Sequence, residues 1–167
     1  MSTRYKIRQK MFSIGDDFWI ENQEGQRVFK VDGKALRLRK TLIFEDMNGK
    51  KLCKIQERLL AIKDTMAIED AGGSQMAVIK KGLIAPLGDH WKVTVRGGPD
   101  LDVQGNILDL EYSINQRRKK IAEVSKQWLN LADTYGVEID DGQNDILILA
   151  VAIAIDMMSH DDDKKRK

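Results

Sequence analysis

The side chains best suited to bind a ligand are four consecutive cations, Arg117, Arg118, Lys119 and Lys120. Guanidinium groups hold phosphate oxygens through paired hydrogen bonds, and ammonium groups attract them as point charges. Near a membrane surface each cation gains about 1 kcal/mol from anionic lipid, so such a cluster would hold a protein only weakly. We predict that the cluster binds anionic groups; an ordinary solvated surface is the alternative.

Smaller basic groups lie elsewhere in the chain. Lys80 and Lys81 form a pair that we add to the candidate ligand-binding residues, and Arg37, Arg39 and Lys40 follow one predicted strand. Aromatic side chains, on which bases would stack, are not interleaved with these cations. The 28 basic and 26 acidic residues also nearly cancel, so no strong overall field attracts a polyanion. We therefore expect no nucleic-acid partner.

The sequence lacks the recognisable catalytic and nucleotide-binding motifs G-x-S-x-G, the P-loop, G-x-G-x-x-G and H-E-x-x-H. The single Cys53 could meet His90 in the folded protein, because such partners need not be adjacent in sequence. Cys53 nevertheless aligns with Phe29 and Ala77 in the repeat described below, which favours a structural position. We predict a protein that is not an enzyme and needs no cofactor.

An acidic run, DDGQND at residues 140–145, first suggests calcium. A calcium loop with glycine at its sixth position would need acidic residues where Val137 and Ile139 stand. Helix capping explains the run better, because Asp and Asn side chains accept hydrogen bonds from the free N–H groups at a helix N-terminus. We predict no metal site.

The helix that would follow is apolar on every side. Residues 146–155 read ILILAVAIAI, whereas a surface helix would keep a polar stripe. The run is too short for a membrane span, which needs about 20 apolar residues. Alternation within it also allows a buried strand, but the pattern continues through Met157 and Met158, which favours a helix at about 143–158. The predicted core residues are Ile146, Leu149, Ala150, Ile153 and Ala154.

Small residues make one side of this helix slim, because Ala150 and Ala154 lie one turn apart. Such a helix would pack closely inside a narrow enclosure. Asp145 and Asp156 are eleven residues apart, near one side of the helix at its two ends. We interpret each as the point where the buried segment meets the mouth of its enclosure, and not as an acid–base pair. An ordinary core helix under an open sheet is the alternative.

An internal repeat precedes the helix. Its copies are FWIENQEGQRVFKV from Phe18, LIFEDMNGKKLCKI from Leu42 and MAIEDAGGSQMAVI from Met66, offset by 24 residues both times. Each copy has an apolar alternating stretch, an acidic or amide residue, a glycine and a second apolar stretch. This pattern predicts a β-hairpin with glycine in the turn. A fourth hairpin, YSINQRRKKIAEV from Tyr112, has the basic cluster in place of the glycine turn.

Alternation of apolar and polar residues continues outside these copies, and turn residues separate the segments. The alternating segments include residues 91–96, 108–114 and 135–140, and the turns include Asp32-Gly33, Gly88-Asp89, Gly97-Gly98-Pro99 and Gly105-Asn106. About twelve strands result, and a sheet that long with one apolar face closes so that no edge is exposed. A barrel that wide is not filled by its own side chains. We predict a mainly β fold, a closed antiparallel barrel that encloses the apolar C-terminal helix.

The hairpin repeat, IAEVSKQW from Ile121, YGVEID from Tyr135 and the ending DILILAVAIAID together resemble the LURP-one-related family. The resemblance extends over roughly residues 4–158. That family shares the tubby C-terminal fold, so the resemblance implies a closed barrel around a central helix. It also implies a remote similarity to phospholipid scramblases, and tubby proteins bind phosphoinositides. We cannot match the lipid-contacting residues of tubby proteins position by position to this chain, so no site residue is carried over.

The composition predicts a single domain at residues 4–159 and an unstructured charged tail at residues 160–167. The final KKRK also fits a nuclear address or a cloning remnant. The lone cysteine cannot form an internal disulfide, and the N-terminus lacks the apolar stretch of a signal peptide. We therefore expect a cytoplasmic protein without a transmembrane span, which could associate peripherally with a membrane.

For function, we predict a non-enzymatic module that binds phosphoinositides or other anionic phospholipid headgroups through basic residues on its outer surface. Two alternatives stay open. One is a protein-interaction or scaffold domain without a lipid role, and the other is a scramblase-like or unrecognised enzymatic activity.

Overall fold

A computed structural model describes residues 2–8, 17–33, 41–57, 65–82, 84–85, 88–129 and 134–166. The basic residues Arg37, Arg39 and Lys40 lie outside these described residues. The described elements are β1 (Ser2–Arg8), β2 (Phe18–Glu21), β3 (Arg27–Asp32), β4 (Thr41–Asp46), β5 (Lys51–Glu57), β6 (Thr65–Asp70), β7 (Gln75–Lys80), β8 (Ile84–Ala85), β9 (Gly88–Val95), β10 (Leu101–Asn106), β11 (Glu111–Gln116), β12 (Lys119–Ser125), β13 (Thr134–Asp140) and α1 (Asp145–Arg166).

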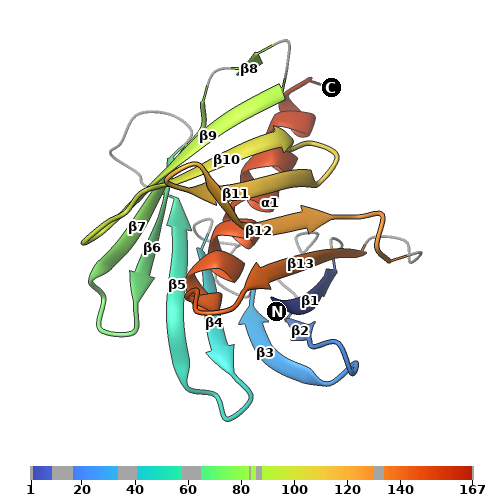
Figure 1. The fold of residues 1–167 in the computed structure, drawn as a ribbon. Helices are drawn as coiled ribbons and strands as arrows, with labels where there is room; N and C mark the ends of the chain where they lie inside the picture. Colours follow the sequence, from blue (N-terminus) through green and yellow to red (C-terminus); the bar gives the residue numbers. More distant parts are fainter. Residues whose placement is uncertain are drawn as a thin grey trace.

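The strands form a closed antiparallel barrel around α1 (Figure 1). The sheet runs in the order β10-β11-β12-β13-β1-β2-β3-β4-β5-β6-β7-β9, and β9 pairs with β10 to close the ring. The short β8 pairs only with β9 and lies outside the ring. Twelve strands therefore make the barrel, which confirms the predicted fold.

The three repeat copies are the hairpins β2–β3, β4–β5 and β6–β7, and their turns share one construction. An Asp or Asn at the turn start accepts hydrogen bonds from backbone N–H groups two and four residues later. In the third copy these bonds run from Gly72 and Ser74 to Asp70 Oδ1, at 3.0 and 2.9 Å. The turn glycines have φ values of 79°, 83° and 88° at Gly25, Gly49 and Gly73. Glycine reaches this left-handed conformation without steric cost.

Two predicted boundaries near β10 and β11 were wrong. The alternating segment from Leu108 was predicted as strand, but residues 107–110 form a turn and β11 begins at Glu111. Leu108 is consequently exposed. Gly105 lies within β10 rather than in a turn. The residue is glycine because a Cβ there would come within 2.6 Å of the Glu111 carbonyl oxygen. Its glycine permits close approach of two strands and does not mark a reversal of the chain.

A similar correction applies to Gly88-Asp89. This pair was predicted as a turn, but it begins strand β9 and pairs with β8. The predicted turn at Gly97-Gly98-Pro99 is confirmed, with positive φ at both glycines. These glycine-containing pairs thus lie near chain reversals, although the strand ends differ from the predicted ones by a few residues.

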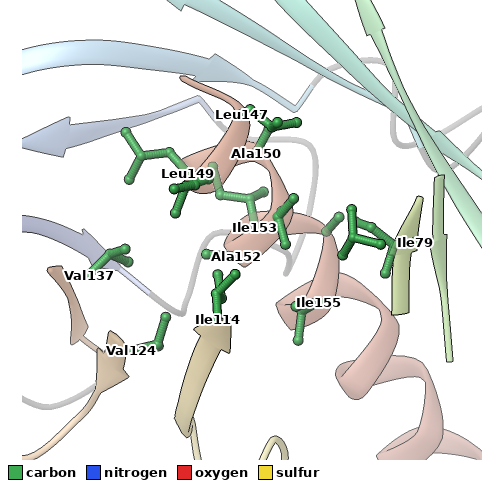
Figure 2. Packing of buried hydrophobic residues seen from close by; sticks show 14 of the residues in the cluster. Ile79, Ile114, Val124, Val137, Leu147, Leu149, Ala150, Ala152, Ile153 and Ile155 are labelled. Atoms are coloured by element: carbon green, nitrogen blue, oxygen red, sulfur yellow. The ribbon is translucent and has the colours of Figure 1, made fainter. Parts of the chain in front are cut away.

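Helix α1 fills the barrel axis. Every side chain from Leu147 to Ser159 is buried, and Leu149, Ala150, Ile153 and Ala154 have no exposed surface, whereas Ile146 is half-buried. Ile114, Val124 and Val137 approach the helix beside Ala152, and Ile79 approaches from another side (Figure 2). An apolar helix surrounded by strands in this way needs no polar face. No helix within the described residues has the apolar length to cross a membrane.

The helix begins near the predicted position but ends later. Asn144 is the N-cap, because its Oδ1 accepts a hydrogen bond of 3.1 Å from the Leu147 N–H. The predicted helix end near residue 158 and the predicted unstructured tail from His160 were wrong, since α1 continues to Arg166. A helix already nucleated inside the barrel adds further turns at little cost. The sequence also places Lys164, Lys165 and Arg166 in the last turn, where cations stabilise the helix dipole.

Candidate functional site

The basic cluster occupies the tip of the β11–β12 hairpin. Gln116 and Lys119 pair across the strands, so Arg117 and Arg118 alone form the turn. Their φ values are 50° and 67°. Two-residue turns of type I′ need positive φ at both positions, and they normally contain Asn-Gly. Two arginines therefore hold a backbone conformation that costs each of them about 1–2 kcal/mol relative to the ordinary right-handed one.

The four cations of this cluster are exposed but differ in their surroundings. Lys120 donates a hydrogen bond of 2.8 Å to Glu123, and this bond raises the pKa of the Lys120 ammonium group. Glu138 and Asp140 also lie near enough to stabilise its charge. Within the described part of the chain, no carboxylate forms an ion pair with Arg117, Arg118 or Lys119. These three cations, which we call the basic turn, remain available to a ligand.

Lys80 and Lys81 do not join the basic turn. Lys80 pairs with Lys92, which pairs with Asp102, which in turn pairs with Asn115. Three strand spacings thus separate Lys80 from the β11–β12 hairpin, about 14 Å. The Lys81 ammonium lies 5.7 Å from the centre of the Trp91 ring, a cation–π contact. The two predicted groups of cations are therefore separate surfaces.

The hypothetical Cys53 and His90 pair is not formed. Cys53 lies on β5 with its side chain in the core, and burial raises the pKa of its thiol to about 12. His90 lies on β9 and is exposed on the outside of the barrel. A buried neutral thiol is a packing residue, as the repeat alignment predicted.

Asp145 and Asp156 occupy different environments. Asp145 accepts a hydrogen bond of 2.6 Å from the Tyr5 hydroxyl in the first turn of α1. Asp156 was predicted at the mouth of the barrel, but it is only 1% exposed and the three residues after it are buried too. Eleven residues of helix separate the two carboxyl groups by about 16 Å, so they cannot act as an acid–base pair.

Asp156 lies among polar side chains inside the barrel. Burial is the main cause that raises the pKa of its carboxyl group to about 7, while the neighbouring Tyr135 hydroxyl and the charge of Lys126 oppose the shift. Burial, and after it the charge of Asp156, raises the pKa of the Tyr112 and Tyr135 hydroxyls. The apolar run in the sequence gave no sign that a polar cluster surrounds its end.

A groove on the outer face of the barrel was not predicted. It has a volume of about 280 Å³ and lies over β1, between the β2–β3 turn and the segment after β12. Its lining residues are Arg4, Tyr5, Lys6, Asn22, Gln23, Gly25, Trp128, Leu129 and Gly136. We name it the β1 groove. Two cations and an indole ring make it chemically distinct from the basic turn.

Trp128 forms one wall of the β1 groove because β13 leaves room for it. A Cβ on Gly136 would lie 2.7 Å from Cε3 of the Trp128 ring, so only glycine permits this packing. The Arg4 guanidinium lies 4.8 Å from the ring centre and donates a hydrogen bond of 2.7 Å to Glu138. Both Trp128 and Gly136 stand in motifs that the sequence made conspicuous, but nothing in their spacing showed that they touch.

Comparison with known proteins gives one consistent result. A sequence model of the family described as LURP-one-related matches residues 3–156. The chain is similar to the uncharacterized protein YxjI of Bacillus subtilis strain 168, with 28% identity over 163 residues that cover 94% of each chain. It also resembles the X-ray structure of a protein from Arabidopsis thaliana, with a TM-score of 0.66 and 14% identity over 93% of this chain and 89% of that one. The structural likeness concerns the fold.

Proposed function

The chain belongs to the LURP-one-related family, and we propose that it is a non-enzymatic module that binds phosphoinositides or other anionic phospholipid headgroups through the basic turn. One observation carries the proposal. Arg117 and Arg118 form an exposed two-residue turn in which both have positive φ.

The cost of this turn supports a role in binding. The repeat hairpins of the same barrel use glycine where φ is positive, at Gly25, Gly49 and Gly73. At the β11–β12 hairpin the chain instead has two arginines, at a cost of about 1–2 kcal/mol each. Backbone strain of this kind concentrates at sites where the side chain has a function. The strained backbone holds two guanidinium groups at the outermost point of the hairpin.

The filled barrel favours headgroup recognition over uptake of a lipid tail. Side chains of α1 from Leu147 to Ser159 occupy the axis, so the space that a carrier protein would keep for an acyl chain contains protein. At about 1 kcal/mol per cation, the three cations of the basic turn would contribute about 3 kcal/mol at an anionic membrane. That corresponds to roughly a hundredfold in binding.

Vesicle co-sedimentation at physiological salt tests the proposal. Vesicles of phosphatidylcholine would be compared with vesicles that contain phosphatidylserine or phosphatidylinositol bisphosphate at matched total charge. The variant Arg117→Asn/Arg118→Gly restores the usual type I′ sequence and removes both charges without strain. Lys50→Gln/Lys51→Gln, at the β4–β5 turn, is the control with the same change of charge.

We expect the protein to sediment with anionic vesicles, the Asn-Gly variant to lose most of this binding, and the control to retain it. A greater effect of the bisphosphate than of equal serine-lipid charge would indicate headgroup recognition. Equal sedimentation of all three proteins, or no binding to any vesicle, would contradict the proposal.

A further inference from the structure

Among the described residues, the seam between β1 and β2 has the fewest paired positions in the barrel ring. Along its other edge β1 pairs with β13 at seven positions, from Ser2–Asp140 to Arg8–Thr134. With β2, the described residues pair at one position, Lys6 and Glu21. Every other neighbouring pair in the ring is joined at four or more positions among the described residues. Residues 2–5 therefore extend past β2 with one edge outside the ladder.

The β2–β3 turn lies opposite this edge but does not pair with it. Its polar groups bond within the turn: the Asn22 N–H donates to the Gln26 carbonyl at 2.9 Å, and Asn22 Oδ1 accepts from the N–H groups of Glu24 and Gln26 at 3.0 and 2.9 Å. Backbone groups along an open strand edge are a template on which another strand can pair. The β1 groove lies at this edge, since Arg4, Tyr5 and Lys6 line it.

The side chains of the β1 groove favour an acidic occupant. Arg4 and Lys6 are two residues apart on one face of β1, a spacing of about 7 Å that matches alternate side chains of a neighbouring strand. None of the described residues that line the groove has a carboxylate. Glu138 and Glu21 pair with these cations from outside the groove. The two charged side chains among the described lining residues are therefore both cations, and a carboxylate that enters the groove would share them with Glu138 and Glu21.

Trp128 and Leu129 give the same groove an apolar wall. The indole ring is half-buried, fixed by its packing on Gly136 and by the Arg4 guanidinium above it. Pre-positioned aromatic rings flanked by a cation are typical of the residues that dominate binding at protein interfaces. An apolar side chain of a partner would cover the ring and remove its exposed face from water.

We propose that the β1 groove binds an extended acidic peptide segment of a partner protein. The segment adds to β1 as a strand through main-chain hydrogen bonds, in the manner of β-strand addition. Its carboxylates, at alternate positions, face Arg4 and Lys6, and an apolar side chain packs on Trp128. Because these carboxylates meet cations that already have partners, they determine which sequence binds more than how tightly it binds.

Selection from a phage-displayed library of random twelve-residue peptides tests this inference on the full chain. Enriched sequences would then be measured as free peptides by fluorescence anisotropy. The test variant is Arg4→Gln/Lys6→Gln. A control that removes one charge is Arg27→Gln, because Arg27 makes a contact like that of Arg4 outside the groove, 4.0 Å from the centre of the Trp19 ring. Thermal unfolding establishes that both variants are folded.

We expect enriched peptides with acidic residues at alternate positions, binding at least tenfold weaker to the Arg4→Gln/Lys6→Gln variant and unchanged binding to Arg27→Gln. Methylation of alternate peptide nitrogens should abolish binding, and hydrogen exchange at the amides of residues 2–5 should slow in the complex. A failure to enrich peptides over the double variant overturns the inference. So do enriched peptides without acidic residues, or with no effect on those amides.

Discussion

At the scale of single residues, Asp156 makes the stability of the barrel depend on pH. Its pKa is about 7 in the folded protein, against an ordinary value of 3.8, chiefly because the carboxyl group is buried. Between these two values the folded state keeps the proton that the unfolded state has lost. The folded protein therefore binds more protons, and its stability falls as the pH rises from about 4 to 7.

Asp156→Asn should remove this dependence, since an amide of the same shape carries no charge. We expect the variant to gain stability relative to the wild type as the pH rises from 5 to 8, by roughly 1–4 kcal/mol. Urea unfolding at each pH measures the difference in free energy of unfolding between the two proteins. The contributions of the other titrating groups are common to both proteins and drop out of this difference. Parallel pH profiles would show that Asp156 keeps an ordinary pKa.

Gly136 leaves space for the Trp128 ring, which packs directly against it. Gly136→Ala places a methyl group 2.7 Å from the Trp128 ring, so the ring must move. We expect a loss of about 1–3 kcal/mol in the free energy of unfolding, together with a red shift of the Trp128 fluorescence as the ring becomes wetter. Trp128→Phe provides the spectral baseline. An unshifted spectrum and an unchanged stability would contradict the packing.

The site residues differ in how far sequence alone could identify them. Arg117 and Arg118 could be predicted because a run of cations between two alternating segments implies an exposed hairpin tip. The β1 groove could not, since Arg4, Trp128 and Gly136 come together only through the pairing of β13 with both β1 and β12. Asp156 was predicted at a boundary because it interrupts the apolar run in the sequence, whereas its burial depends on how deep the helix lies in the barrel.

At the scale of elements, the positive φ values of Arg117 and Arg118 in the β11–β12 turn lower the free energy of unfolding of the protein. Arg117→Asn/Arg118→Gly should raise the free energy of unfolding by roughly 1–3 kcal/mol, because both new residues accept positive φ more readily. Gly49→Ala is the opposite case. Nothing lies within 4 Å of its added Cβ, so the expected loss of about 1 kcal/mol comes from the backbone alone.

Chemical unfolding of the two variants beside the wild type measures both effects. A destabilised Asn-Gly variant would mean that the arginine side chains contribute contacts that outweigh the strain of their backbone.

The turn sequences also explain why the repeat hairpins could be predicted. An Asp or Asn three residues before a glycine specifies this turn chemically, whereas the 107–110 turn depends on Leu110, a residue that gives no such signal at φ 54°.

At the scale of the whole molecule, the barrel and its helix fit one another closely. Ala150→Leu or Ala154→Leu should cost about 1–3 kcal/mol or more, because both positions are completely buried and strands surround them. Ala71→Leu, in the exposed β6–β7 turn, is the control with the same change of side chain. Thermal unfolding distinguishes them. Equal melting temperatures for the buried and exposed variants would contradict a filled barrel axis.

The closed barrel and its filling depend on each other. Removal of residues 146–167 deletes every buried side chain on the axis, and each buried Ile, Leu or Met contributes about 1.5–3 kcal/mol. That sum exceeds the roughly 5–15 kcal/mol by which a domain is usually stable. We therefore expect the truncated chain not to fold, with poorly dispersed amide resonances and no cooperative unfolding.

Removal of residues 160–167 alone should leave a cooperative protein, because the buried side chains that the structure describes in α1, from Leu147 to Ser159, all remain. We expect a loss of about 1 kcal/mol or less, from the shorter helix and its missing C-terminal cations. Urea unfolding compares the two truncated chains with the intact one. A cooperative transition in the chain that ends at Asp145 would mean that strand side chains fill the barrel and that the barrel folds without the helix.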